Sequence, residues 1–195
     1  SELMAAFDQW VCDPAPRRKD LESFLARGDA LHTTYRGHLV CSSSGTTGHP
    51  GIYVYDASTV AVFEALALAR IDRAWLRPRD WSALARRGMR WSAAVATGGG
   101  YTGEVWMAAQ ARRSQWHRKR YRTFSVQRPL PDLVRALNDF DPTILTAYAT
   151  CLPLLAQEKQ AGRLRIQPIL IESSVCELTC STWKLLTEGS ASITA

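Results

Sequence analysis

Four short apolar runs in the second half of the chain alternate with segments of helical spacing, and this alternation restricts the fold more than any other feature. The strands are expected over residues 91–97, 121–126, 143–148 and 167–172. The helices between them are expected over residues 103–112, 132–138 and 151–161. Strands that are joined through helices pair in parallel, with right-handed crossovers. The sequence therefore predicts an α/β fold with a layered, mainly parallel sheet flanked by helices.

Two further apolar runs, at residues 38–42 and 52–55, enclose a loop that is rich in glycine and hydroxyl side chains. The loop reads Ser43-Ser44-Gly45-Thr46-Thr47-Gly48-His49-Pro50-Gly51. Its glycines let the backbone turn tightly and bring N–H groups close to a ligand, and its hydroxyls add donors. Because Gly48 is followed by His49-Pro50, this is not the common GxxxxGK[ST] phosphate loop. We expect a strand–loop–strand phosphate-binding hairpin ahead of the parallel sheet.

Helices are also expected ahead of the parallel sheet. Residues 1–36 read as an interrupted helical lead-in, in which Asp20 caps the run 21–27. A short helix is expected over residues 81–87, with Pro78 lying beyond the end of the helix before it.

The longest helix is expected directly after the hairpin. Asp56 or Ser58 can cap it, and Val62, Phe63 and Leu66 fit one buried face.

The order of these segments resembles one known family. The run Ser-Gly-Thr-Thr-Gly-x-Pro, which by itself could be a flexible Ser/Gly turn, is similar to the phosphate-binding motif of the adenylate-forming superfamily of acyl-coenzyme A ligases. The rest of the chain resembles the phenylacetate–coenzyme A ligase-like branch across roughly residues 7–179. The segments that carry this resemblance are Tyr35-Arg36-Gly37-His38, Ala96-Thr97-Gly98-Gly99-Gly100, residues 129–138 leading into Phe140-Asp141-Pro142, Leu155-Ala156-Gln157-Glu158 and Gly162-Arg163-Leu164.

The resemblance implies an activity and its ligands. The family activates a carboxylic acid with ATP as an acyl-adenylate for transfer to coenzyme A or another thiol, so ATP, Mg²⁺ and coenzyme A are the implied cofactors. The residues implied to hold the β and γ phosphates are Ser43, Ser44, Gly45, Thr46, Thr47 and Gly48. Those implied to line the acyl pocket are Gly99, Tyr101 and Tyr148, and Glu177 would approach the nucleotide. No catalytic residue is assigned.

Several of these positions also have ordinary structural interpretations. Tyr101 and Tyr148 fit equally well as core aromatic residues with a solvated hydroxyl, and Glu177 fits as an acid at a helix N-terminus. Gly51 stands where the family commonly has Lys, so one fixed positive charge is missing. His49 either replaces that charge in part or is a loop residue without a role.

The family continues beyond the point where this chain ends. A tyrosine-containing motif ending in Thr-Glu, a hinge and a mobile C-terminal domain are expected, whereas Thr187-Glu188-Gly189 comes only eleven residues after Glu177 and lacks the aromatic residue. We interpret residues 37–188 as part of the large N-terminal α/β domain and residues 189–195 as a frayed tail, with the mobile domain absent. The alternative is a truncated, non-catalytic nucleotide-binding or interaction domain.

The positive charge of the chain is unevenly distributed. The formal net charge is +6, and no Asp or Glu occurs between Val105 and Pro131. The cations in this basic stretch are Arg112, Arg113, Arg118, Lys119, Arg120, Arg122 and Arg128. A solvated surface, an anionic cofactor such as coenzyme A, and nucleic acid are the three interpretations. Since no nucleic-acid motif accompanies the charge, we expect a small-molecule acid and a nucleotide as partners rather than nucleic acid; an oligomer stays possible.

Composition and motifs argue against several other classes. The chain has 195 residues, 46% of them hydrophobic and 22% charged, as in ordinary globular domains. No stretch reads as a membrane span or signal peptide, so we expect a cytoplasmic protein without a membrane partner. Five widely spaced cysteines indicate free thiols, and Cys176 and Cys180 lack a second ligand pair, so no metal site is expected. No G-x-S-x-G motif supports a serine hydrolase.

Because the mobile domain is expected to be absent, this chain should not complete acyl-coenzyme A synthesis. Incubation with ATP, coenzyme A and a panel of aryl and fatty acids should yield no thioester above the level formed without protein. Repeated turnover in this assay would contradict the interpretation of residues 37–188 as part of a larger catalytic unit.

Overall fold

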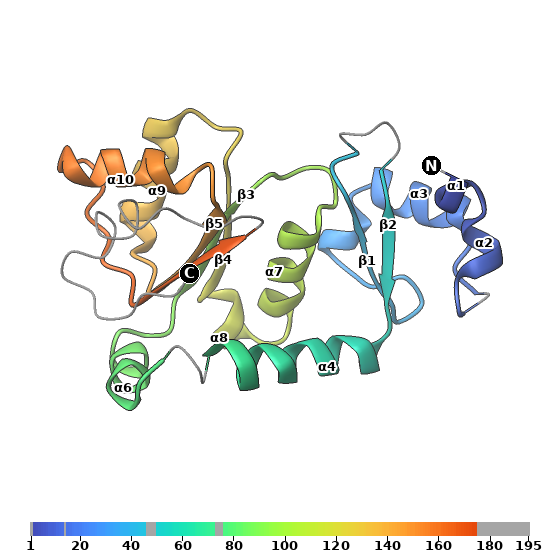
Figure 1. Cartoon of the computed structure of the whole chain (residues 1–195), viewed down its shortest axis with the longest axis horizontal. Helices are drawn as coiled ribbons and strands as arrows, with labels where there is room; N and C mark the ends of the chain where they lie inside the picture. Colours follow the sequence, from blue (N-terminus) through green and yellow to red (C-terminus); the bar gives the residue numbers. More distant parts are fainter. Residues whose placement is uncertain (1, 14, 46–49, 73–75, 175–195) are drawn as a thin grey trace.

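Two β-sheets lie on either side of one helix in this protein (Figure 1). The computed structural model describes residues 2–13, 15–45, 50–72 and 76–174. The larger sheet is parallel and has the order β4-β3-β5-β6. Its strands are β3 (Trp91–Val95), β4 (Tyr121–Ser125), β5 (Ile144–Tyr148) and β6 (Leu170–Ser174). The predicted α/β class with a parallel sheet is confirmed.

The smaller sheet is the antiparallel pair β1 (Leu39–Ser42) and β2 (Ile52–Tyr55), which pairs Leu39 with Tyr55 and Ser42 with Ile52. Helices of the lead-in pack against it, with Phe7, Leu21 and Phe24 in one buried cluster with the hairpin. These elements are α1 (Glu2–Ala5), α2 (Phe7–Trp10), α3 (Arg18–Ala26) and the 3₁₀ turn η1 (Asp29–Leu31). The hairpin therefore has a core of its own.

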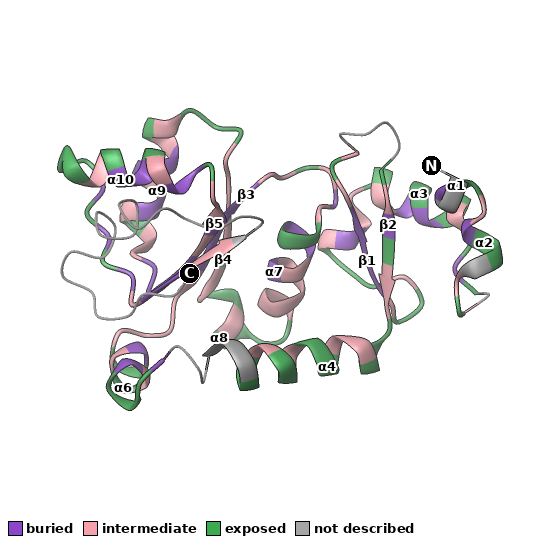
Figure 2. Cartoon of the chain, in the orientation of Figure 1, coloured by how far each residue is buried: buried purple, intermediate pink, exposed green. Residues whose placement is uncertain are grey.

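Helices cover both faces of the parallel sheet. The three crossover helices are α7 (Thr102–Arg112), α9 (Leu130–Phe140) and α10 (Leu152–Gln160). Ala94 of β3 packs in one cluster with residues of α9 and α10, whereas its neighbours Ala93 and Val95 pack with Met107 of α7. Successive side chains of a strand point to opposite faces, so α7 lies on one face and α9 and α10 lie on the other. The central strands are accordingly buried, as Figure 2 shows.

Helix α7 belongs to both cores. Val105 is fully buried in the cluster of the hairpin and lead-in, and Met107 is buried in a cluster on the parallel sheet. Residues two positions apart lie about 200° apart around a helix, so these side chains point in nearly opposite directions. The short helix α8 (Gln115–Arg118) then leads into β4.

A side-chain ladder crosses three strands of the parallel sheet. Trp91 Nε1 on β3 donates to Thr146 Oγ1 on β5 at 2.8 Å, and that hydroxyl donates to Glu172 Oε2 on β6 at 2.6 Å. A slip of one residue would move each side chain to the other face, so the ladder helps to specify the register.

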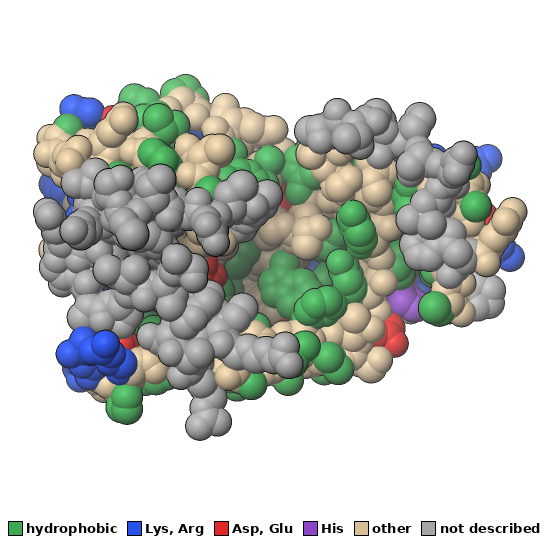
Figure 3. Space-filling model, viewed as in Figure 1, with side chains coloured by type: hydrophobic (Ala, Val, Ile, Leu, Met, Phe, Trp, Pro, Cys, Tyr) green, Lys and Arg blue, Asp and Glu red, His purple; other side chains and the backbone are tan. Residues whose placement is uncertain are grey.

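The predicted buried face of the helix after the hairpin is wrong. Asp56 caps α4 (Ala57–Leu66), which continues into the π-helical turn η2 (Ala67–Asp72), and its carboxylate accepts from Thr59 N at 2.7 Å. However, the exposed fractions of Val62, Phe63 and Leu66 are 57, 49 and 41%. The helix rests on its neighbours through Val60, Glu64 and one side of Phe63, whose ring lies 5.8 Å from that of Tyr55 and 6.3 Å from that of Trp106. Figure 3 shows hydrophobic side chains along α4.

Two predicted helix starts are also wrong. The N-cap of α3 is Arg17, and Asp20 lies in the first turn instead of capping the helix. Helix α6 (Pro78–Arg86) begins at Pro78, which was placed outside it. Proline is favoured in the first turn because it has no N–H to leave unpaired, and Asp80 accepts from Arg77 N at 2.9 Å.

The last strand begins later than predicted. Residues 163–169 form a connection in which Leu164 and Ile166 are buried without pairing in the sheet, and β6 starts at Leu170. Residues 167–169 of the predicted strand belong to this connection, since Pro168 has no N–H to donate to a strand ladder, and the strand continues to Ser174, beyond the predicted end at Glu172. Helix α9 extends beyond the predicted 132–138 at both ends, and α8 was not predicted. The sequence also predicts a helix from about residue 179, which lies outside the described residues.

Ser92 on β3 is fully buried, and its hydroxyl has no hydrogen-bond partner within residues 76–174 or the other described ranges. An unpaired buried hydroxyl is destabilising, so Ser92→Ala should leave the free energy of unfolding unchanged or raise it by up to about 1–3 kcal/mol. Leu145→Ala, in the same core, should lower it by about 2–5 kcal/mol. Denaturant titration measures both, and a loss above about 1 kcal/mol in Ser92→Ala would show that the hydroxyl is paired.

Candidate functional site

The strand order places a topological switch point at the carboxyl edge of the parallel sheet, which is where open α/β sheets typically form a ligand-binding crevice. The chain passes from β3 through α7 to β4 on one side, and then through α9 and α10 to β5 and β6 on the other. The direction in which successive strands are added to the sheet therefore reverses between β3 and β5. In open α/β sheets, ligands bind outside the carboxyl ends of the strands at such a switch point. Tyr148, the last residue of β5, spans it: its hydroxyl accepts from Ala96 N at 3.3 Å.

A tight glycine turn, residues 96–101, forms the β3 side of this crevice. The Tyr101 ring lies directly on Gly99, because a Cβ built at residue 99 would be 2.3 Å from Tyr101 Cζ. A side chain at residue 99 would therefore displace the ring. Gly98 and Gly100 have φ angles of 87° and 65°, which few other residues adopt.

Glu104 holds this turn, and the sequence reasoning missed it. Gly98 N donates to Glu104 Oε1 at 3.1 Å and to Oε2 at 3.0 Å, and only 7% of the residue is exposed. The signal in the sequence was an acid in the first turn of a helix that directly follows a glycine run.

Hydrogen bonds join the hairpin to the same turn. Ser42 N donates to Gly100 O at 2.8 Å, and Ser42 Oγ donates to Gly99 O at 2.6 Å. Ser42 also forms a parallel bridge with Tyr101. The structure therefore places Ser42, the residue directly before the hydroxyl-rich loop, beside two of the expected acyl-pocket residues, Gly99 and Tyr101, although they are more than 50 positions apart in sequence.

The two ends of the loop bind each other. Ser43 N donates to Gly51 O at 2.9 Å, and Gly51 N donates to Ser43 Oγ at 2.8 Å. Gly51, which stands where the family commonly has Lys, thus closes the loop. Ser44 is exposed, and Gly45 has a φ of 66°. The remaining expected phosphate-binding residues, Thr46, Thr47 and Gly48, and also His49 and Glu177, lie outside the described residues.

The reactive side chains near the crevice are few. Tyr148 packs against the clusters on both faces of the sheet, as expected of a core aromatic residue. Cys41 lies on β1, and burial raises the pKa of its thiol to about 12, although a hydrogen bond with Thr102 opposes the rise. The thiol is therefore not a nucleophile near neutral pH. Within the described ranges, no three His, Cys, Asp or Glu side chains are grouped to bind a metal ion.

Comparisons with models of protein families and with curated proteins gave no match. In the part of the chain that the structure covers, no helix has both the length and the apolar character to cross a bilayer.

Removing the Glu104 carboxylate should loosen the glycine turn. We expect Glu104→Ala to lower the free energy of unfolding by about 1–3 kcal/mol, because it leaves Gly98 N–H without its acceptor. Amide exchange at Gly98 should accelerate. Glu104→Gln is the matched control, since its side-chain oxygen can still accept this hydrogen bond. If Gly98 exchanges equally slowly in Glu104→Ala, the carboxylate does not hold the turn.

Proposed function

We propose that this chain is part of an adenylate-forming acid–thiol ligase, whose hydroxyl-rich loop binds the phosphates of ATP. The observation that carries the proposal is the pair of hydrogen bonds from Ser42 to Gly99 and Gly100. They hold the start of the loop at the switch-point crevice, where a phosphate group and an acyl group would have to meet.

The reaction requires anions to be held close together. A carboxylate oxygen of the acid bonds to the α-phosphorus, the bond from that phosphorus to the bridging oxygen breaks, and pyrophosphate leaves. A thiol then attacks the acyl carbon and displaces AMP. Donors that are oriented before the reaction stabilise such charge most effectively. The exposed hydroxyl of Ser44 and the backbone around Gly45 have the chemistry to bind phosphate oxygens, and Mg²⁺, when bound with ATP, would neutralise part of their charge.

The acyl group would occupy the crevice beside the glycine turn. Because Gly99 has no side chain, the backbone and the Tyr101 ring can lie close to a ligand. The Tyr148 hydroxyl accepts from Ala96 N, so its own hydrogen stays available to donate to a ligand oxygen. No carboxylic acid is favoured over another by these contacts.

A second candidate is a nucleotide-binding or interaction domain without catalysis. One observation favours it: the large apolar side chains Val62, Phe63, Leu66 and Leu68 are 41–57% exposed on α4 and the turn that follows. Contiguous exposed apolar side chains are typical of surfaces that contact other proteins. This candidate would be favoured if ATP binds but no acyl-adenylate forms, either with this chain alone or with a longer protein that contains it.

Mg-ATP or pyrophosphate should bind weakly, and the loop should be required. A Cβ at Gly45 would lie 2.8 Å from Pro50 Cγ, so Gly45→Ala should deform the loop and weaken binding by about tenfold or more. Thr47→Val, which removes one hydroxyl, should act in the same direction. Calorimetric titration measures the affinities.

Gly162→Ala is the matched control for backbone strain. Gly162 lies in the turn after α10 and has a similar φ of 73°. A Cβ at this residue would meet no atom within 4 Å. It should bind Mg-ATP as the unchanged protein does. Equal affinity in Gly45→Ala, Thr47→Val and the unchanged protein would remove the loop as the phosphate site.

A further inference from the structure

Some cations of the basic stretch bind a main-chain oxygen or a carboxylate within the fold, and the others have no such partner among the described residues. Arg112 donates to Leu31 O and Arg113 pairs with Glu64. Arg120 donates to Gly88 O and lies over the Trp116 ring at 4.2 Å. The cations with exposed side chains and no ion pair to a described carboxylate are Arg118, Lys119, Arg122 and Arg128. If the basic stretch binds an anion, these four exposed cations are therefore the ones that are available to it.

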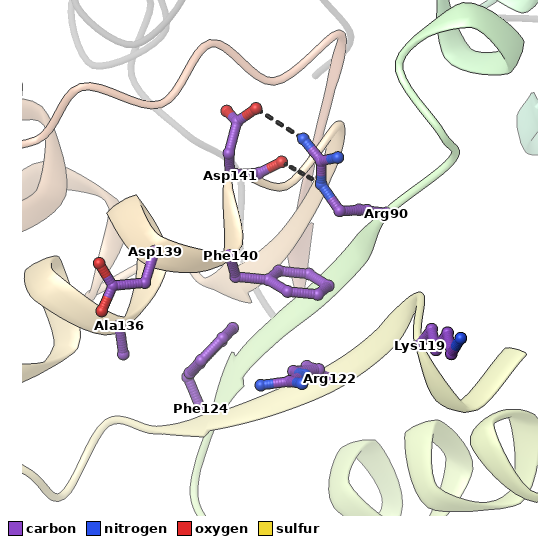
Figure 4. Close-up of a pocket in the computed structure, with 8 residues that line it drawn as sticks. All are labelled: Arg90, Lys119, Arg122, Phe124, Ala136, Asp139, Phe140 and Asp141. Atoms are coloured by element: carbon purple, nitrogen blue, oxygen red, sulfur yellow. Dashed lines mark hydrogen bonds and ion pairs between the residues drawn. The ribbon is translucent and has the colours of Figure 1, made fainter.

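Lys119 and Arg122 line a hollow at the amino edge of the parallel sheet. The hollow has a volume of about 540 Å³, within the range of small-molecule sites. Its walls come from the start of β3, the start of β4 and the end of α9 (Figure 4). The lining residues are Arg90, Lys119, Arg122, Phe124, Ala136, Asp139, Phe140 and Asp141. This edge is opposite to the one that carries the switch-point crevice.

The charges in the hollow favour an anion. Arg90 is held in place by Asp141: Nε donates to the Asp141 backbone oxygen at 2.8 Å, and one terminal nitrogen pairs with Oδ2 at 2.6 Å. Arg87 also pairs with Asp141 at 3.4 Å. The carboxylate is thus neutralised, and Asp139 is the other acid of the lining. Lys119 and Arg122 have no ion pair with a described carboxylate, so their donors are available to a ligand.

An aromatic wall adjoins these cations. The Phe140 ring lies 5.7 Å from that of Phe124, and the Arg122 guanidinium lies 5.5 Å from the centre of the Phe140 ring. Figure 4 shows the Phe140 ring between Arg90 and Arg122. A planar group beside an anion could therefore pack on Phe140 while the anion reaches the cations. A guanidinium can bind two oxygens of one phosphate in parallel, and a phosphate monoester has a third terminal oxygen for a second cation such as Lys119.

We propose that this hollow binds a small phosphate monoester that carries a planar ring, at a site separate from the hydroxyl-rich loop. Lys119 and Arg122 bind the phosphate, and the ring packs on Phe140. The assignment does not depend on the proposed ligase function, because no lining residue belongs to the crevice or the loop.

Phenyl phosphate is the test ligand, with inorganic phosphate and phenol as its two halves. Titrations followed by nuclear magnetic resonance at near-physiological salt should show phenyl phosphate binding about two- to tenfold more tightly than inorganic phosphate, because of the ring contact. Shifts should occur at the amides around Arg122 and Phe140. Lys119→Ser combined with Arg122→Ser should weaken binding about tenfold or more, since charge-assisted hydrogen bonds are lost.

Arg118→Ser combined with Arg128→Ser is the matched control. It removes the same charge from the same stretch but changes no lining residue, and its affinity should stay within about twofold of the unchanged protein. Both double variants replace exposed side chains, and equal thermal melting shows that they are folded. Gly45→Ala should leave phenyl phosphate binding at the hollow unchanged, which separates this site from the loop.

Three results would overturn the proposal. The first is no binding of phenyl phosphate. The second is equal weakening in the two double variants, which would indicate a diffuse charge effect. The third is tighter binding of a labelled single-stranded oligonucleotide at the same salt, with loss in the Lys119 and Arg122 variant, which would assign the hollow to nucleic acid.

Discussion

The two-sided burial of α7 is the interaction on which the rest of the structure depends. Val105 on one side completes the core of the hairpin and lead-in, and Met107 on the other side covers β3. Without this helix the two sheets would share little apolar surface, since Ser42 meets the glycine turn through hydrogen bonds alone. Removing apolar area from water on two faces at once is what positions the hairpin against the carboxyl edge of the parallel sheet.

The crevice follows from that arrangement. Because α7 begins directly after the glycine turn, its first turn brings Glu104 back onto Gly98, and the same turn accepts the hydrogen bonds of Ser42. The start of the loop, the turn and the end of β5 are thereby connected through hydrogen bonds between side chains and main-chain groups. The hollow around Phe140 lies at the other edge, where Arg90 holds the end of α9 through Asp141. The two candidate sites consequently have independent sets of supporting contacts.

Much of the fold could be predicted from the sequence because it depends on local patterns. The runs that became β1 to β5 are short and separated by a loop or by helical segments, and the segment that became α9 places Leu133, Val134 and Leu137 on one side, so periodicity was sufficient. It failed on α4, where apolar residues surround the helix and the pattern does not show which side makes contact. It failed again at residues 167–169, which belong to the connection before β6, because Pro168 has no N–H for a strand ladder. The acyl-pocket role of Gly99, Tyr101 and Tyr148 stays a prediction, and the sequence did not indicate that Ser42 and Glu104 bond to the glycine turn.

The sequence by itself determined the alternation of strands and helices, the parallel sheet, and a loop whose glycines and hydroxyls suit an anion. These are properties of neighbouring residues, which each segment carries with it. Only the tertiary structure decided that the start of the loop lies beside Gly99 and Tyr101, and that Glu104 holds Gly98. It also decided that Lys119 and Arg122 line a hollow with Phe140, whereas Arg112 and Arg120 bind main-chain oxygens within the fold. Such contacts join residues that are distant along the chain, and they form only when burial on both sides of α7 has set the position of each element.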